Sequence, residues 1–300
     1  MDPPKENTRI LDKAVLYVAF VSALFNFLPV PRSNDRYPPI PLPAPPPRNE
    51  SQPEDSAPEA GAHLIETGTI IHVLVVKSII FENQTIRKGF VRKVFGILLA
   101  QLLFTCAVIT AFVYHEPTKQ FVQSNSVVVF VAMIVNIVVL VMIVCVESVR
   151  RKHPVNLIFL AIFTFTMSVL LGTASSVMDS DIVLLAVGIT AVLVIALSVY
   201  AVQTKYDYSA KGGVMITFVM LLIVLAVCRI SMPEFIDSLP IAGLCAVIAC
   251  LFLIYDMQSI IGGNHAEQLD PEEYVFAALT LYLDVVRIFI YILRILRKFE

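Results

Sequence analysis

The amino-acid sequence predicts an all-α integral membrane protein, built as a bundle of about seven transmembrane helices. Hydrophobic residues make up 57% of the 300 residues and charged residues only 15%, with a mean hydropathy of +0.80. This composition lies well outside that of ordinary soluble domains. A helix needs about 20 apolar residues to cross the roughly 30 Å hydrocarbon core, because its backbone groups must be hydrogen-bonded internally.

Seven apolar stretches are long enough to cross the membrane, and short polar connections separate them. The predicted spans are 94–113, 127–146, 156–174, 182–201, 213–230, 241–261 and 274–296. Every one of them is predicted to be helical, because a lipid-exposed strand or loop would leave backbone groups unpaired.

Basic residues in the short loops predict the orientation, because cytosolic loops carry the excess of Lys and Arg. They gather before the first span, between spans two and three, and between spans four and five: Arg87, Lys88, Arg92, Lys93, Arg150, Arg151, Lys152, Lys205 and Lys211. The N-terminus is therefore predicted to be cytosolic. Seven spans place the C-terminus outside although Arg294, Arg297 and Lys298 lie there, and we still favour seven spans.

Residues 1–85 are predicted to form a cytosolic tail, Pro-rich and largely disordered, ahead of a membrane domain at 86–300. An apolar segment at 14–30 follows three basic residues and resembles a signal anchor, although no cleavage site of small residues follows it. Pro43, Pro46 and Arg48 in the proline tract have the spacing that SH3-like adaptors bind, but a disordered cytosolic tail is the favoured interpretation of the tract. The apolar stretch 67–81 has no assigned role.

Several classes of protein are excluded by what the sequence lacks. A formal net charge of −2 without a basic run gives no footprint for nucleic acid. The zinc and redox signatures HExxH and CxxC are missing, and the five cysteines show no disulfide spacing. We therefore expect no cofactor and no resident metal.

Two carboxylates at membrane depth are the main candidates for function. Asp256 lies toward the end of the sixth predicted span, and Asp284 near the middle of the seventh. Because an ionisable side chain at depth costs about 2.5–3.5 kcal/mol, it needs a partner or a role. Consecutive spans are usually antiparallel neighbours, so the two can face each other, share a proton, and attract Ca²⁺ when deprotonated. The alternative is two isolated aspartates, each bound to its own neighbours.

Other polar residues in the spans modify this picture. Arg287 follows Asp284 by three residues and shares its helix face, so an ion pair there would hold Asp284 ionised and weaken proton sharing. Asn136, Thr164 and Ser168 are polar groups at depth of the kind that usually holds helices together.

Six sequence blocks follow one another in order between about residues 86 and 297. They are IRKGFVRKVF at 86–95, RKHPVN at 151–156, QTKYDY at 203–208, YDMQ at 255–258, PEEY at 271–274 and LYLD at 281–284. As a set these blocks are specific, and through them the sequence resembles the transmembrane Bax-inhibitor-motif family, and within it the Lifeguard branch.

This resemblance implies a bundle wrapped around a central C-terminal helix, and a pH-sensitive calcium leak channel of the endoplasmic reticulum or Golgi membrane that suppresses apoptosis. It also implies that Asp256 and Asp284 are the gating pair, with Ca²⁺ as the permeant ion. Acidic loop residues are predicted to line the luminal mouth: Asp179, Asp181, Glu234 and Asp237. Arg287 stands where relatives are usually neutral, and residues 14–81 match no part of the family.

Two other functions remain open at this point. An intramembrane aspartyl protease also needs two aspartates on adjacent spans, but that family has Gly-x-Gly before the second, and here LYL precedes Asp284. We therefore do not expect an enzyme. An interaction protein would act through partners, such as apoptosis regulators of the Bcl-2 type or SH3-like adaptors, with its helices as the membrane anchor.

Overall fold

The structure is a computed structural model that describes residues 58–204, 239–261 and 273–299, together with 206, 218, 221 and eight positions between 13 and 25. All regular elements in this part of the chain are helical. They are α2 (Pro58–Tyr114), α3 (Glu116–Ser124), α4 (Ser126–Cys145), α5 (Glu147–Arg151), α6 (Val155–Ser175), α7 (Ser180–Gln203), α10 (Leu239–Ile261), α11 (Tyr274–Leu296) and the short 3-10 helix η4 (Arg297–Phe299).

Six of the predicted spans are confirmed as helices long and apolar enough to cross a membrane. They are Thr85–Tyr114, Val127–Cys145, Val155–Ser175, Ser180–Gln203, Leu239–Ile261 and Tyr274–Phe299. The remaining predicted span, 213–230, lies outside the described residues apart from Phe218 and Leu221. Helices α4 and α7 are apolar around their whole circumference and expose much of it, as expected for helices that face lipid.

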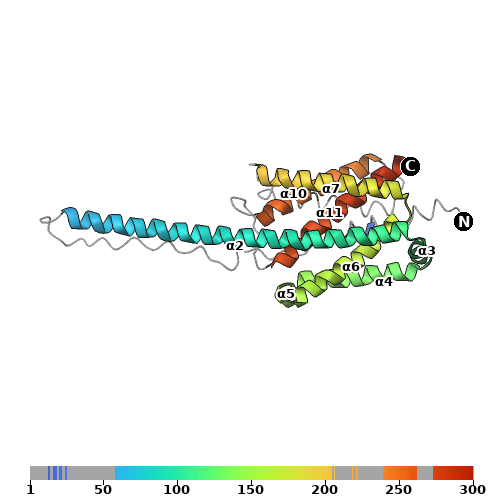
Figure 1. Ribbon diagram of the computed structural model, residues 1–300, viewed down its shortest axis with the longest axis horizontal. Helices are drawn as coiled ribbons and strands as arrows, with labels where there is room; N and C mark the ends of the chain where they lie inside the picture. Colours follow the sequence, from blue (N-terminus) through green and yellow to red (C-terminus); the bar gives the residue numbers. More distant parts are fainter. Residues whose placement is uncertain are drawn as a thin grey trace.

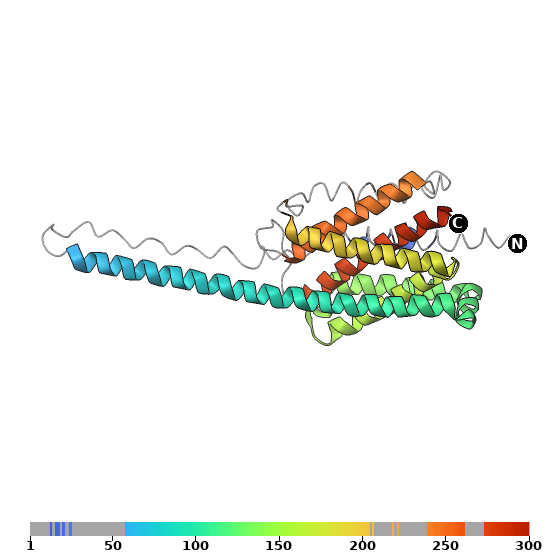
Figure 2. The same cartoon turned by 45° about the horizontal axis from the view of Figure 1, so that its top comes forward.

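Helix α11 is the centre of the bundle, as the resemblance implied. Its most apolar window is 100% buried, against 17–61% for the other spans. Figures 1 and 2 show it passing obliquely between α7 and α10 on one side and α4 and α6 on the other. It runs without a break from the end of the bundle that holds α5 (the α5 end) to the end that holds α3 (the α3 end). The predicted seventh span therefore crosses the whole bundle and is not a re-entrant segment.

Helix α2 is much longer than a membrane span requires. Its residues from Pro58 to Tyr114 would measure about 85 Å at 1.5 Å per residue, and its N-terminal part extends beyond the other helices (Figure 1). The predicted boundary between tail and membrane domain falls inside this single helix.

Basic residues gather at the α5 end, where they hold helix termini together. Arg87 on α2 donates hydrogen bonds to the carbonyl oxygens of Ser259 (2.9 Å) and Ile261 (3.1 Å), which lie at the end of α10 and lack helical partners. The ammonium group of Lys93 lies 3.3 Å from the centre of the Tyr274 ring, at the start of α11. The α2 helix is thus fixed to both ends of the α10–α11 connection.

Candidate functional site at the seam of α10 and α11

The central helix carries a polar stripe along its whole length. Five polar residues of α11 follow one another at intervals of three or four, so they share one face: Thr280, Asp284, Arg287, Tyr291 and Arg294. All five are buried, none more than 6% exposed. Because α11 is surrounded by other helices, this stripe lies inside the bundle and cannot face lipid.

The structure brings the two predicted aspartates together. The side chain of Asp256, half-buried on α10, lies within interaction distance of the carboxyl group of Asp284, which is 1% exposed. Two carboxyl groups hydrogen-bond directly only when one of them carries a proton, since ionised carboxylates are acceptors alone. The seam between α10 and α11 therefore holds an acid pair suited to sharing a single proton.

Arg287 lies against this pair. Its Nη2 atom is 3.5 Å from Oδ1 of Asp284, and its guanidinium carbon is 4.9 Å from the centre of the Phe252 ring. The side chain is 1% exposed, and its Nε and Nη1 atoms find no hydrogen-bond acceptor within the described part of the chain. Buried donors of this kind are normally satisfied by water, so the site is chemically suited to hydration.

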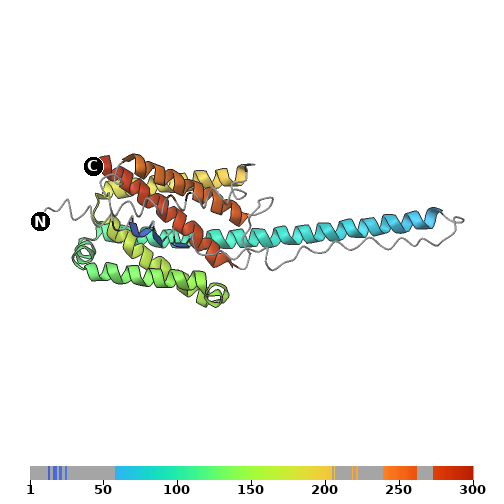
Figure 3. The same cartoon turned by 180° about the vertical axis from the view of Figure 1, so that it is seen from behind.

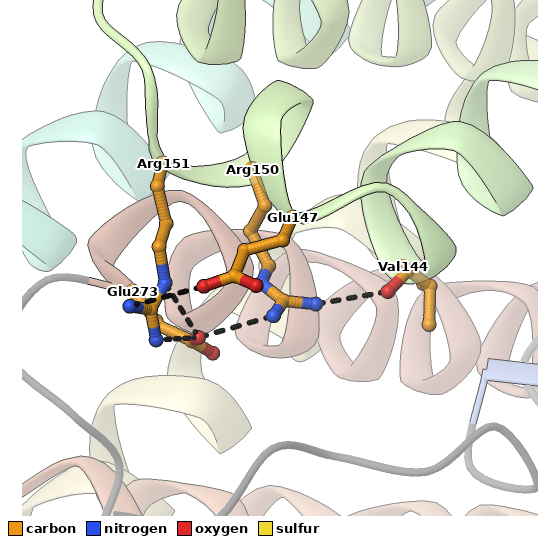
Figure 4. Close-up of polar contacts among 5 residues, drawn as sticks. All are labelled: Val144, Glu147, Arg150, Arg151 and Glu273. Atoms are coloured by element: carbon orange, nitrogen blue, oxygen red, sulfur yellow. Dashed lines mark hydrogen bonds and ion pairs between the residues drawn. The ribbon is translucent and has the colours of Figure 1, made fainter. Parts of the chain in front are cut away.

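A second ionic cluster, at the α5 end, was not singled out from the sequence. Oε1 of Glu273 lies 2.7 Å from Nη2 of Arg151 and 3.2 Å from Nη2 of Arg150 (Figure 4). Nη1 of Arg150 donates to the carbonyl oxygen of Val144 at 2.8 Å. Glu273 is completely buried, so α5 is tied to the residue that precedes α11. The sequence did contain a signal for this cluster. Arg150 and Arg151 follow the second predicted span and Glu273 precedes the seventh, so their opposite charges lie on the same side of the membrane.

Neutral polar contacts join the remaining helices to α11. The hydroxyl of Thr105 on α2 lies 2.9 Å from those of Ser168 on α6 and Tyr282 on α11. Gln101 donates to the hydroxyl of Thr164 at 2.8 Å. Asn136 on α4 donates to the Thr166 hydroxyl on α6, also at 2.8 Å. Asn136, Thr164 and Ser168 thus hold helices together, the role usual for such residues.

The other predicted site residues lie away from the acid pair. Asp179 and Asp181 are exposed at the start of α7, at the α3 end of the bundle. The remaining predicted site residues lie outside the described part of the chain: Glu234, Asp237, Pro43, Pro46 and Arg48. Among the residues that the structure describes, no group of three or more His, Cys, Asp or Glu side chains could hold a metal ion.

The fold and the site together define a class: a polytopic helical membrane protein whose last span is central and carries buried ionisable groups. Comparison with known families makes this assignment specific. The chain belongs to the Bax1-I family, described as inhibitor of apoptosis-promoting Bax1, which it matches over residues 87–300.

Individual relatives agree with this assignment. Protein lifeguard 3 from Homo sapiens is 33% identical over 220 residues, which cover 72% of this chain and 70% of the relative. Protein lifeguard 3 from Mus musculus is 32% identical over 219 residues, covering 72% and 71%. The Golgi anti-apoptotic protein of Vaccinia virus (strain Lister) is 33% identical over 219 residues, covering 73% of this chain and 89% of the viral protein.

Proposed function

We propose that this protein is a pH-sensitive calcium leak of an internal membrane, of the endoplasmic reticulum or the Golgi, that suppresses apoptosis. The observation that carries the proposal is the proximity of Asp256 on α10 to the buried Asp284 on the central helix α11. The description of the family and the name of the viral relative support the anti-apoptotic role and the Golgi membrane.

The acid pair acts as a proton-responsive latch between α10 and α11. While the two carboxyl groups share a proton, their hydrogen bond joins the helices. When that proton leaves, two negative charges face each other in a medium of low dielectric constant, and they repel each other while attracting a hard cation. Ca²⁺ prefers carboxylate and carbonyl oxygens as ligands, so it is the ion that this pair would bind transiently during permeation.

Arg287 modulates the latch. Its guanidinium group, 3.5 Å from Asp284, favours the ionised carboxylate and competes with an entering cation for the same oxygen atoms. The pH response of this chain is therefore weaker than that of a variant with a neutral residue at position 287.

The acidic residues at the α3 end form the luminal mouth of the proposed leak. Asp179 and Asp181 are exposed there, and an acidic rim raises the local concentration of cations. Replacing both by Asn should lower the flux and leave its dependence on pH unchanged.

The test measures Ca²⁺ flux through the purified protein in liposomes across a pH series. The variants are Asp256→Asn, Asp284→Asn and Arg287→Ala, with Glu147→Gln as a control that removes an exposed carboxylate at the α5 end, away from the proposed luminal mouth. We expect a pH-dependent flux that either aspartate variant makes independent of pH, while Arg287→Ala steepens the dependence and the control changes nothing.

A flux no greater than that of empty liposomes in every variant would contradict the leak. The protein would then act on cell death through partners, such as regulators of the Bcl-2 type or SH3-like adaptors. In that case Asp256→Asn and Asp284→Asn would leave cell protection intact, while deletion of the tail at residues 1–85 or of the loops would remove it.

A further inference from the structure

The described positions of the N-terminal segment at residues 13–25, which precedes the family match at 87–300, pack against the membrane bundle. Four of its apolar side chains are at most 5% exposed: Tyr17, Val18, Val21 and Phe25. Tyr17, Val21 and Phe25 repeat every four residues and so form one face of a helix. Phe20, between them, is 51% exposed. The segment therefore has an inner face that the bundle covers and an outer face that it leaves open.

Tyr17 fixes the segment in the seam between α4 and α6. Its hydroxyl donates to Oδ1 of Asn136, at 2.7 Å and fully buried. The amide nitrogen of Asn136 donates in turn to the carbonyl oxygen of Phe163 (3.1 Å) and to the hydroxyl of Thr166 (2.8 Å). Without Tyr17, a buried oxygen atom of Asn136 would lose this donor, which is costly at membrane depth.

Phe25 fixes the same segment to the central helix. Its ring stacks on that of Phe276, in the first turn of α11, with centroids 4.9 Å apart and an angle of 23° between the planes. Figure 3 shows the described part of the segment, in dark blue, beside α11. The guanidinium carbon of Arg150 lies 5.9 Å from the centre of the same Phe276 ring. The segment is thus joined, through one ring, to the ionic cluster of Arg150 and Glu273.

We propose that residues 13–25 are a releasable clamp on α11, an autoinhibitory contact that holds the seam of α10 and α11 closed. Its effect on flux rests on the proposed leak, whereas its effect on the seam does not. The clamp contacts α11 at Phe276, three residues after the anchored Glu273, on the side where the chain from α10 enters the helix. Holding α11 at this point opposes its rotation or tilt relative to α10.

The sequence between the clamp and α2 is long enough for the clamp to leave the bundle. Residues 26–57 join it to α2 and would reach on the order of 100 Å when extended. The family match begins after this connection and covers five of the six described spans entirely and the first from residue 87 onward, so the clamp is an addition to the family's membrane domain.

The first experiment tests the position of the clamp. In the full chain with its five native cysteines replaced by Ala, Phe25→Cys is combined with Phe276→Cys and oxidised in liposomes. We expect a disulfide, because the native rings stack face to face. The matched control combines Phe20→Cys, on the exposed face of the segment, with Phe276→Cys and should not form one. Equal oxidation of both pairs, or of neither, would overturn the docking.

The second experiment tests the autoinhibition with two readouts. Tyr17→Phe and Phe25→Ala are compared with Phe20→Ala for Ca²⁺ flux at one pH. In chains that keep only Cys250, the half-buried cysteine of α10, they are also compared for its modification rate by a small thiol reagent. We expect Tyr17→Phe and Phe25→Ala to raise both rates several-fold and Phe20→Ala to change neither. The oxidised Phe25→Cys, Phe276→Cys protein should carry the lowest flux.

The outcomes separate the clamp from the leak. Faster modification of Cys250 without flux in any variant would support the clamp and contradict the calcium leak. A disulfide that forms while flux and modification rates stay unchanged in Tyr17→Phe and Phe25→Ala would overturn the autoinhibition, leaving the segment a packing element only.

Discussion

At the scale of single residues, the buried charged side chains are the groups that most need a specific partner. Glu273 is completely buried and has two guanidinium groups within 3.2 Å of one oxygen atom. Arg287 is buried against one carboxylate and one aromatic ring. An isolated charge buried in this way would cost several kcal/mol. These contacts offset that cost and so allow the charged residues to be buried.

Replacing Glu273 by Gln should destabilise the bundle strongly. The change leaves Arg150, 4% exposed, without its carboxylate, and removal of one member of a buried ion pair typically costs about 3–5 kcal/mol. Thermal unfolding of the purified protein in lipid nanodiscs measures the effect. Glu147→Gln is the matched control: its carboxylate is 56% exposed and pairs with Arg151 at 3.4 Å, a contact worth about 0–1 kcal/mol. Similar losses from both changes would contradict the assignment of the buried cluster.

Gly172 should not tolerate even a methyl group. A Cβ atom built there would lie 2.8 Å from Cγ of Phe112, and relieving such overpacking typically costs about 1–3 kcal/mol. Gly172→Ala should therefore lower the unfolding temperature. Gly96→Ala, on the same helix as Phe112 but with nothing within 4 Å, should leave it unchanged or raise it slightly. A stabilised Gly172→Ala protein would show that α2 and α6 are farther apart than this.

At the scale of elements, the helices of the core meet along faces that mix apolar and hydrogen-bonding groups. On α6 the buried residues Asn156, Thr164, Ser168 and Ser175 share one face. Asn156 donates to the hydroxyl of Tyr274 at 2.8 Å, at the beginning of α11. Such contacts specify which helices are neighbours, because apolar surfaces alone pack almost equally well against lipid.

The hydroxyl of Thr105 should matter more than its methyl group. Thr105→Val keeps the shape of the side chain but removes the partner of both Ser168 and Tyr282, for a loss of about 1–3 kcal/mol. Unfolding in nanodiscs again measures it. Thr110→Val is the control on the same helix, since its exposed hydroxyl bonds only to the carbonyl oxygen of Cys106 in its own helix. An equal effect of the two changes would argue against the junction of α2, α6 and α11.

At the scale of the whole molecule, the direction of α11 decides on which side of the membrane the C-terminus lies. Helix α11 begins at the α5 end, where Arg87, Lys93, Arg150 and Arg151 gather, and ends at the α3 end. If the basic end is cytosolic, the last residues emerge on the luminal side in spite of their own positive charges.

Glycosylation in cells tests this orientation. Two segments of the sequence match the glycosylation acceptor pattern, Asn49-Glu50-Ser51 and Asn83-Gln84-Thr85. On the cytosolic side both should stay unmodified, whereas an acceptor site on an extension after Glu300 should be glycosylated. The same extension with its acceptor Asn replaced by Gln is the control. Glycosylation of Asn83, or no glycosylation of the extension, would contradict the predicted orientation.

The class of protein, the places of six spans and the candidate aspartates followed from the sequence alone, because hydrophobic length is a local property of the chain. The contacts of the site did not. Tyr17 meets Asn136 and Arg151 meets Glu273 across more than a hundred residues. Partners at such distances are chosen by the packing of whole helices, which no pattern along the chain records. The spacing of three residues already placed Arg287 on the helix face of Asp284, but only the tertiary structure placed Asp256 beside that face and the N-terminal segment against the central helix.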